Sequence, residues 1–354
     1  MQDFQKGQCM VCKTLVDFSG FSPLSVIKCP ECGAELIVPW KFGNYMLTEK
    51  EKKESAFFNF YLGYTRKKNQ NVRVGILKKD IPEYNFWLEQ CEKEIKFIKT
   101  LVHENVMPIL DSGLECGYFY YSEPCPDGFS INEYDPNKVG ELEVESVLEF
   151  GKKLAGAIDA IHYKEFIHHN IEPKNIFIEK NGVVKILDLF LSRIEYFYVE
   201  RNGSMQFAAS PYYISPEKAE KGKEDKMGDV FSFGVFLYYF LTGKYPYDGE
   251  TNEEIVFSRV KRKQSSKISE IEYVFPEHIV AYRGEEIREK IAELIERLLK
   301  PYPVQRPAAG EFVSELRLIE AEEDRLEAEE KRKHFLDHTK SVKIPMMEKL
   351  SDEK

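Results

Sequence analysis

The segment Ile167–Arg193 constrains the fold of this 354-residue chain more than any other stretch of the sequence. Two short apolar runs, Asn175–Glu179 and Val183–Leu187, flank an Asn-Gly dipeptide, which predicts a β-hairpin with a tight turn. One acidic residue, Asp188, directly follows the hairpin. A hairpin that brings Asn175 and Asp188 together would present oxygen ligands of the kind that Mg²⁺ prefers. The alternative interpretation is a solvated loop with an ordinary Asn/Asp turn.

The same segment resembles the catalytic and metal-binding loops of eukaryotic-type (Ser/Thr) protein kinases, which read H-R-D-L-K-x-x-N followed by D-F-G. His168, Asn175 and Asp188 match that pattern. Other positions depart from it: His169 replaces Arg, Asn170 replaces the catalytic Asp, Glu172 replaces Lys, and Leu189 and Phe190 replace Phe and Gly. The resemblance implies an α+β, bilobal fold, in which a small five-stranded β lobe with one helix, helix C, precedes a large helical lobe.

Two C-x-x-C pairs stand near the start of the chain: Cys9 with Cys12, and Cys29 with Cys32. Each pair can occupy a tight turn, and two such turns complete a tetrahedral set of four thiolates. Because four thiolates close the coordination shell, we expect a structural rather than a catalytic Zn²⁺. The module resembles a zinc ribbon. The alternative is four reduced cysteines on two unrelated turns.

Composition limits the partners and the compartment of the chain. The net charge of −10 and the pI near 5.5 argue against a general binder of phosphate backbones, so we do not expect a nucleic-acid partner. No apolar run approaches the length of about 18 residues that a membrane-spanning helix needs, and the first residues lack the apolar core of a signal peptide. Closely paired cysteines indicate a reducing, cytoplasmic environment.

We expect four parts, which are a zinc ribbon at 1–40, a kinase-like small lobe at 41–126, a kinase-like large lobe at 127–318 and a charged helical tail at 319–354. Runs rich in β-forming residues predict strands, and apolar residues at near-helical spacing predict one helix in the small lobe. The predicted strands are Phe57–Tyr64, Asn71–Leu77, Val106–Leu110 and Gly117–Ser122, and the predicted helix is Phe86–Leu101.

The stretch NVRVGILKKD resembles the third-strand pattern V-A-V-K-x-L-K-K, which places Gly75 where the family carries its phosphate-gripping Lys. A slipped register would make Lys78 the equivalent, but on an ideal strand Lys78 faces the opposite side. Glu94 falls at the Glu of helix C. Without a lysine at position 75 we expect Glu94 to lack its usual ion-pair partner; the alternative is an ordinary surface Glu.

The stretch that corresponds to the glycine-rich loop lacks glycine, because Lys53, Ser55 and Phe58 take the three glycine positions. Glycine there lets backbone N–H groups approach phosphates, and we expect the Phe58 ring to stand in that space. The alternative is a longer loop with a different alignment. Further along, Glu123 and Cys125 resemble the hinge between the lobes, and the proline between them lacks an N–H donor.

Three positions of the large lobe match family residues with structural roles. Glu217 lies in a Ser-Pro-Glu that resembles A-P-E, Asp229 opens a stretch similar to D-V-W-S-F-G-V, and Arg306 lies in a late R-P motif. The resemblance implies a buried Glu217–Arg306 ion pair and an Asp229 that supports the catalytic loop.

The departures concern the chemistry rather than the fold. The amide of Asn170 cannot accept a substrate proton, Glu172 would repel phosphate, and Gly75 provides no cation, which leaves Asn175 and Asp188 as the remaining candidate Mg²⁺ ligands. We therefore predict a pseudokinase that binds a protein partner and binds ATP and Mg²⁺ poorly. The alternative is an active or atypical Ser/Thr kinase with a relocated lysine, either Lys53 or Lys78.

Overall fold

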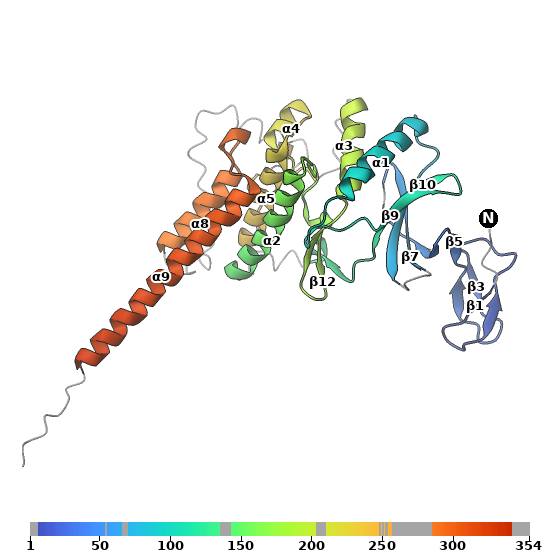
Figure 1. The fold of residues 1–354 in the computed structure, drawn as a ribbon, viewed down its shortest axis with the longest axis horizontal. Coiled ribbons are helices and arrows are strands. Elements are labelled where there is room, and N and C mark those ends of the chain that lie inside the picture. The colour runs from blue at the N-terminus through green and yellow to red at the C-terminus, as the bar shows by residue number, and fades with distance from the viewer. Residues whose placement is uncertain are drawn as a thin grey trace, which may run out of the picture.

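The computed structural model describes residues 6–53, 55–65, 70–134, 143–202, 210–247, 249, 251, 254–256 and 285–341. In Figure 1 a small β module lies at the N-terminal end, a β-sheet with one helix follows it, and a helical body occupies the other side. The last helix, α9 (Ala309–Ser341), extends far beyond that body. The sequence thus folds into a β-rich small lobe and a helical large lobe, as predicted.

The N-terminal module consists of two antiparallel hairpins with the same design. The hairpins are β1 (Lys6–Gln8) with β2 (Leu15–Asp17), and β3 (Val26–Lys28) with β4 (Glu35–Ile37). Each hairpin loop carries one C-x-x-C pair. Between the hairpins lies a small apolar core that includes Val16, Phe18 and Val38. A core this small contributes little folding free energy, so metal binding is expected to supply much of it.

The small lobe is built on a six-stranded sheet with the order β5-β6-β7-β8-β10-β9. Its strands are β5 (Trp40–Phe42), β6 (Tyr45–Lys50), β7 (Phe58–Thr65), β8 (Asn71–Leu77), β9 (Asp111–Glu115) and β10 (Tyr118–Pro124). The sheet therefore has one strand more than the five we expected. The addition is the short edge strand β5, which follows the N-terminal module and pairs with β6.

The strand predicted at Val106–Leu110 is wrong, because the start of this segment pairs with the large lobe and only its last residue, Leu110, donates to the sheet, at the Ser122 carbonyl. The Met107 N–H donates to the Ile186 carbonyl at 2.9 Å, and the Ile186 N–H donates to the Asn105 carbonyl at 2.8 Å. The segment therefore connects the helix of the small lobe with the hairpin of the large lobe before β9 begins.

Helix α1 (Tyr84–Ile98) confirms the predicted helix of the small lobe. Its buried face consists of Trp87, Cys91, Ile95 and Ile98, which recur at helical spacing. The Trp87 ring packs edge-on against Phe57, with their centroids 5.0 Å apart. This contact fixes the helix against the segment that leads into β7.

The large lobe contains the helices α2, α3, α4, α5, α8 and α9 and a three-stranded sheet. The helices other than α9 are α2 (Val144–Tyr163), α3 (Leu189–Asn202), α4 (Pro216–Lys221), α5 (Lys226–Thr242) and α8 (Glu285–Leu298), and the strands are β11 (Gly128–Ser130), β12 (Ile176–Glu179) and β13 (Val184–Ile186). Strands β12 and β13 form the hairpin predicted from the sequence. Helix α5 is buried along nearly all of its length, as its apolar sequence requires.

A buried ion pair and a buried carboxylate hold the large lobe together. Arg306 binds Glu217 through two parallel hydrogen bonds, Nη1 to Oε1 at 2.7 Å and Nη2 to Oε2 at 2.8 Å. Asp229 accepts the backbone N–H groups of His168 and His169, each at 2.8 Å, and a ring N–H of His162 at 2.9 Å. Both arrangements agree with the structural roles that the resemblance implied.

The charged tail continues the last helix without a break at residue 318. The first half of α9 packs against α2 and α8 through the ion pairs Lys152–Glu320 at 2.9 Å and Lys290–Glu322 at 2.8 Å. Residues 342–354, the end of the expected tail, lie outside the described residues. Among the helices that the structure describes, none combines the length and the apolar composition needed to cross a bilayer.

Arg306→Ala should lower the free energy of unfolding by about 3–5 kcal/mol, because the Glu217 carboxylate would remain buried without its partner. Urea denaturation followed by circular dichroism measures the loss. Arg297→Ala is the matched control: Arg297 also forms a two-bond pair, with Glu315, but both side chains are more than a third exposed, so we expect a loss of about 0–1 kcal/mol. Equal losses would contradict the role of the buried pair.

Candidate active site

The four cysteine sulfurs of the N-terminal module lie within 4.8 Å of one another. Cys9 Sγ is 3.7 Å from Cys32 Sγ, and Cys12 Sγ is 3.6 Å from Cys29 Sγ. In a tetrahedral site with Zn–S bonds of about 2.3 Å, the sulfur atoms are about 3.8 Å apart. The distances between the sulfurs therefore fit a tetrahedral metal ion.

The two turns that carry these cysteines share one backbone design. The Lys13 N–H donates to the Cys9 carbonyl and the Gly33 N–H donates to the Cys29 carbonyl, both at 2.9 Å. Lys13 and Gly33 both adopt a left-handed conformation, with φ of 63° and 69°. This turn is what brings the two cysteines of each pair to the same side.

The centre of the cleft between the lobes is the carboxylate of Asp188, which is 2% exposed. Arg73 forms an ion pair with one of its oxygens and Lys53 forms an ion pair with the other. Burial by itself would raise the pKa of Asp188, but these two cations outweigh it and hold the pKa below its ordinary value. Asp188 is therefore an ionised carboxylate with both oxygens already bound by side chains.

Arg73 is the residue of this cleft that the sequence analysis overlooked. It comes from the central strand β8 and replaces the Ala of the V-A-V-K pattern. Its guanidinium group also contacts Glu123 at 2.8 Å, directly across from it in the register of β8 and β10. Burial raises the pKa of Glu123, and Arg73 opposes that shift. Because of this buried arginine, Glu123 and Asp188 share one cation.

The hinge residues are committed to the protein's own contacts. Glu123 is 3% exposed and faces Arg73. Pro124 has no N–H group, and the N–H of Cys125 donates to the Asn71 carbonyl at 3.1 Å. At positions 124 and 125, therefore, no backbone N–H is available to a ligand.

Gly75 has no space for a side chain. A Cβ atom at this position would lie 2.6 Å from Tyr121 Cε1 and 3.1 Å from Phe60 Cε1, well inside the contact distance. The rings next to it belong to a buried aromatic cluster, made of Phe58, Phe60, Phe119, Tyr121 and Phe190. A lysine at position 75 would have to displace this cluster, so the packing itself excludes it.

Phe58 and Phe190 are core residues of this cluster. The Phe58 ring is 1% exposed and lies edge-on to Tyr121, with their centroids 5.3 Å apart. Phe190 packs against Tyr121 at 4.9 Å and against Phe58 at 5.9 Å. The residues that replace glycine in the two loops thus form a continuous apolar layer across the cleft.

The polar groups of the loop before β7 bind other residues of the protein. Ser55 Oγ donates to Glu195 Oε1 at 3.1 Å, and Lys78 Nζ donates to the Ser55 carbonyl at 2.6 Å. Lys53, from the same loop, reaches Asp188. Two lysines could replace the one that the family carries at position 75. Lys53 binds the Asp188 carboxylate, and Lys78 binds the backbone of the loop before β7.

Glu94 has an ion-pair partner, contrary to our expectation. Its carboxylate contacts Arg193 Nε at 2.9 Å, and both side chains are largely buried. Arg193 lies on α3, which begins directly after Asp188. The sequence did not show this pair because we did not predict a helix after the D-F-G position. The Tyr198 ring of α3 adds an edge-on contact with Phe57 at 5.1 Å.

The residues of the catalytic loop support its own backbone. Burial lowers the pKa of His168, whose Nε2–H donates to the Leu187 carbonyl at 2.9 Å and whose Nδ1 accepts the Asn170 N–H at 3.2 Å. Asn175 Nδ2 donates to the Asn170 carbonyl at 2.9 Å. His168 therefore acts as a neutral structural residue, and one end of the Asn175 amide is already bound.

Glu172 does not face the cleft with an uncompensated charge. Its carboxylate forms an ion pair with Lys174 at 2.6 Å and accepts the Ser210 N–H at 3.1 Å. The repulsion of phosphate that we expected from Glu172 is thus reduced by its own lysine. Beside it, Asn170 Oδ1 is buried and has no hydrogen-bond partner among the described residues.

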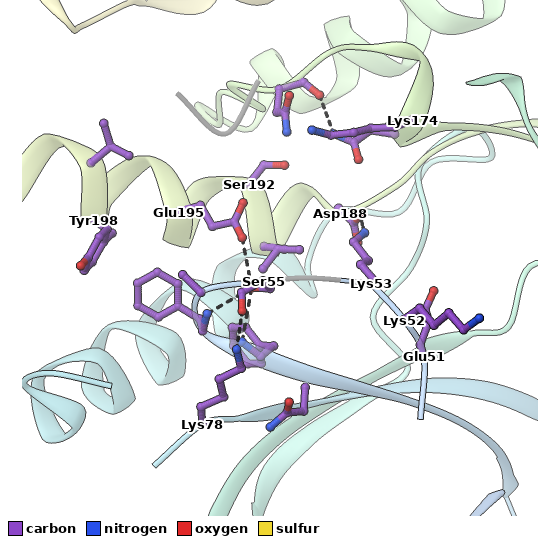
Figure 2. A pocket seen from close by; sticks show the side chains of 18 of the residues that line it. Glu51, Lys52, Lys53, Ser55, Lys78, Lys174, Asp188, Ser192, Glu195 and Tyr198 are labelled. Carbon is purple, nitrogen blue, oxygen red and sulfur yellow. Dashed lines mark hydrogen bonds and ion pairs between the residues drawn. The ribbon is translucent and has the colours of Figure 1, made fainter. Parts of the chain in front are cut away.

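A cavity of about 1100 Å³ opens between the loop before β7, the catalytic loop and α3. Figure 2 shows its charged side chains, which come from these three segments and, in the case of Lys78, from the end of β8. Of the predicted site residues, the cavity wall includes Lys53, Ser55, Phe58, Asn170, Asn175 and Asp188. It does not include Gly75, Glu94, Glu123, Cys125, His168 or Glu172. The cavity therefore lies beside the catalytic loop and not at the hinge.

Comparison with known proteins places this arrangement in a family. The model of the protein kinase domain matches residues 56–316, most of the chain. Serine/threonine-protein kinase PrkC of Bacillus subtilis is 27% identical over 209 residues, which is 59% of this chain and 32% of that protein. A probable serine/threonine-protein kinase of Clostridium perfringens is 26% identical over 73% of this chain and 36% of its own length. The chain thus spans about a third of these relatives.

Solved structures agree on the fold. The PknI kinase domain of Mycobacterium tuberculosis superposes with a TM-score of 0.53 at 16% identity, and the match covers 79% of this chain and 98% of that domain. At this identity the likeness concerns the fold alone.

Gly75→Ala should lower the free energy of unfolding by about 1–3 kcal/mol, because the added methyl group must push Tyr121 and Phe60 out of a packed cluster. Chemical denaturation measures the change. Gly113→Ala is the control, since the nearest atom to its Cβ would be 3.7 Å away, and we expect a change of about 0.5 kcal/mol or less. A neutral Gly75→Ala would show that the cluster leaves room for a side chain.

Proposed function

The chain belongs to the protein kinase family, and we propose that its kinase domain is a pseudokinase, which transfers little or no phosphate and acts by binding a protein partner. One observation carries this proposal. The Asp188 carboxylate, the acid in the D-F-G position, is bound on both oxygens by Arg73 and Lys53. A divalent cation would have to compete with these two cations for the same carboxylate oxygens.

The residues of the cleft do not fit Mg²⁺ in this arrangement. A cation at Asp188 would have to displace Arg73, which is 6% exposed, or Lys53, whose side chain is 28% exposed. Separating one member of a buried ion pair costs about 3–5 kcal/mol. The second candidate ligand, Asn175, has its amide nitrogen bound to the Asn170 carbonyl. Because that bond uses the nitrogen and not the oxygen that would bind a cation, Asp188 alone opposes Mg²⁺ here.

The groups that would perform the transfer step are also missing. An amide such as that of Asn170 cannot accept the proton of a substrate hydroxyl, and loss of a general base costs about 10²–10⁴-fold in rate. No cation projects from position 75, where packing leaves space for no side chain. By contrast, Asp229 and the Glu217–Arg306 pair make the structural contacts expected of the family. This contrast favours a domain that keeps the kinase fold without phosphate transfer.

One observation favours a second candidate function, an active or atypical Ser/Thr kinase. Lys53 reaches Asp188 and lines the cavity, so a change that released Arg73 would leave a lysine and an acid facing each other. In that state Lys53 would serve as the relocated lysine. The two proposals differ in whether labelled phosphate from ATP ever reaches a protein.

We expect the full chain, incubated with radiolabelled ATP, Mg²⁺ or Mn²⁺ and general protein substrates, to incorporate no more label than the Asp188→Ala variant. The reason is that Arg73 and Lys53 already compensate the charge of Asp188, so that a metal ion would have to compete with them. Transfer by the unmodified chain that disappears in both Asp188→Ala and Lys53→Ala would overturn the pseudokinase proposal and support the relocated-lysine kinase.

We propose Zn²⁺ as the ion held by Cys9, Cys12, Cys29 and Cys32, and a reducing compartment such as the cytoplasm as the place where these thiols remain reduced. The support is the tetrahedral spacing of the four sulfurs and the preference of four thiolates for zinc. With its shell closed by protein ligands, such an ion stabilises the N-terminal module and takes no part in catalysis.

Metal analysis should find about one zinc per purified chain. Cys9→Ser should lose the metal and should make the N-terminal module sensitive to proteolysis, because metal binding supplies its folding free energy. Cys116→Ser, a change at an exposed cysteine outside the cluster, is the control and should retain the zinc. A metal-free module that resists protease would contradict the proposal.

A further inference from the structure

The N-terminal module and the sheet of the small lobe are joined by two residues, Val38 and Pro39, because β4 ends directly before Val38 and β5 begins directly after Pro39. On the module side, the Val38 N–H donates to the Ser25 carbonyl at 2.9 Å, and the Val38 carbonyl accepts the Leu24 N–H at 2.7 Å. Pro39 has a φ angle that its ring fixes. The joint is therefore short and stiff.

The residues at the two ends of this joint belong to two different hydrophobic cores. Val38 is 3% exposed and packs in the core of the module with Val16 and Phe18. Trp40 packs in a second cluster, in the small lobe, where its ring lies edge-on to Tyr61 with the centroids 5.2 Å apart. Neighbouring residues of the chain thus anchor both cores.

The second cluster, which we call the outer core, lies on the face of the sheet opposite to Arg73 and Gly75. Its members on β8 alternate with these two residues along the strand and therefore point to the other side. The fully buried members of the outer core are Phe42, Tyr45, Leu47, Val72, Val74 and Ile76.

Strand β5 covers the outer core from the edge of the sheet. Its Phe42 ring is 1% exposed and lies edge-on to Tyr120 of β10, with the centroids 5.6 Å apart, although three strands separate β5 from β10 in the sheet order. From the neighbouring strand β6, the Tyr45 hydroxyl donates to Asp111 of β9 at 3.2 Å. The sheet therefore curls, and the hairpin of β5 and β6 closes over its outer face.

Strand β5 has little support of its own. It is three residues long and, among the strands that the structure describes, it pairs with β6 alone. A short strand at the start of a folded unit frays unless another element ties it down. The element that ties β5 down is the N-terminal module, which we expect to depend on a metal for much of its folding free energy.

We propose that the metal-bound N-terminal module is a clamp on the small lobe, which orders β5 through Val38 and Pro39 and so closes the outer core. Without metal the module unfolds, Val38 leaves its core, and β5 detaches from β6. The outer core includes Val72 and Val74, the neighbours of Arg73 on β8, so the clamp packs against the strand that carries the contact between the lobes.

This inference rests on the proposed zinc site and goes beyond it, because it gives the metal an effect on a different part of the fold. It does not depend on whether the domain transfers phosphate. Metal content is measured beside every optical readout, so that failure of the zinc site and failure of the clamp give different results.

The two tryptophans of the chain report on the two faces of the small-lobe sheet, since Trp40 belongs to the outer core and Trp87 to the core beneath α1. In the Trp87→Phe variant of the full chain, removal of zinc with the chelator TPEN should shift the fluorescence of Trp40 to longer wavelength. The reason is that the indole leaves its contacts with Phe42 and Tyr61 for water. In the matched control, Trp40→Phe, the fluorescence of Trp87 should not shift.

A flexible spacer of Gly and Ser residues between Val38 and Pro39 tests whether the effect passes through the joint. Such a spacer keeps the module attached but no longer fixes its position relative to β5. In the Trp87→Phe background, the spacer variant should retain its zinc. Its Trp40 fluorescence should lie at the longer wavelength from the start and should not respond to TPEN.

Four results would overturn the inference. Loss of zinc without a shift of Trp40 would show that the sheet is independent of the module, and the zinc site would stand by itself. Equal shifts of Trp40 and Trp87 would show that metal loss unfolds the whole lobe. A spacer variant that responds to TPEN like the unmodified joint would exclude coupling through Val38 and Pro39. Absence of zinc from the purified chain would refute the zinc site and the clamp together.

Discussion

The interaction on which the cleft depends is the buried contact of Arg73 with Glu123 and Asp188. The three residues come from β8, from β10 and from the end of the catalytic hairpin, so one guanidinium group links the small lobe to the large lobe. Lys53 adds a second cation to Asp188. Because two carboxylates in a dry site need compensating charge, the protein supplies from its own side chains what a metal ion would otherwise provide. The proposal that Asp188 binds no cation rests on these two contacts.

Packing reinforces this electrostatic arrangement. The aromatic cluster around Tyr121 occupies the space next to Gly75, and the ring of Phe190, in the third D-F-G position, belongs to it. Directly after Asp188 the chain forms helix α3, whose Arg193 binds Glu94 of α1. The helix of the small lobe is therefore held by α3 rather than by a lysine of the sheet. The departures at positions 75 and 190 thus have a structural explanation in the aromatic cluster.

The cavity that remains lies between the loop before β7, the catalytic loop and α3, away from the hinge. Five lysines line its wall, Lys50, Lys52, Lys53, Lys78 and Lys174. The N-terminal module is a separate case, since its four sulfurs lie at the distances of a tetrahedral metal site.

The sequence by itself determined the family, the two lobes, the catalytic hairpin and the cysteine cluster. These features depend on local patterns: an Asn-Gly turn between apolar runs, helical spacing in α1 and two C-x-x-C pairs. It also identified Gly75 and Asn170 as departures from the catalytic pattern. Only the tertiary structure decided what replaced the lost groups, because Arg73, Lys53 and Arg193 reach their acids across 115, 135 and 99 positions of the chain. Ion pairs between residues so distant in sequence leave no periodic signal, and an arginine on a strand gives no sign of which carboxylate it will bind.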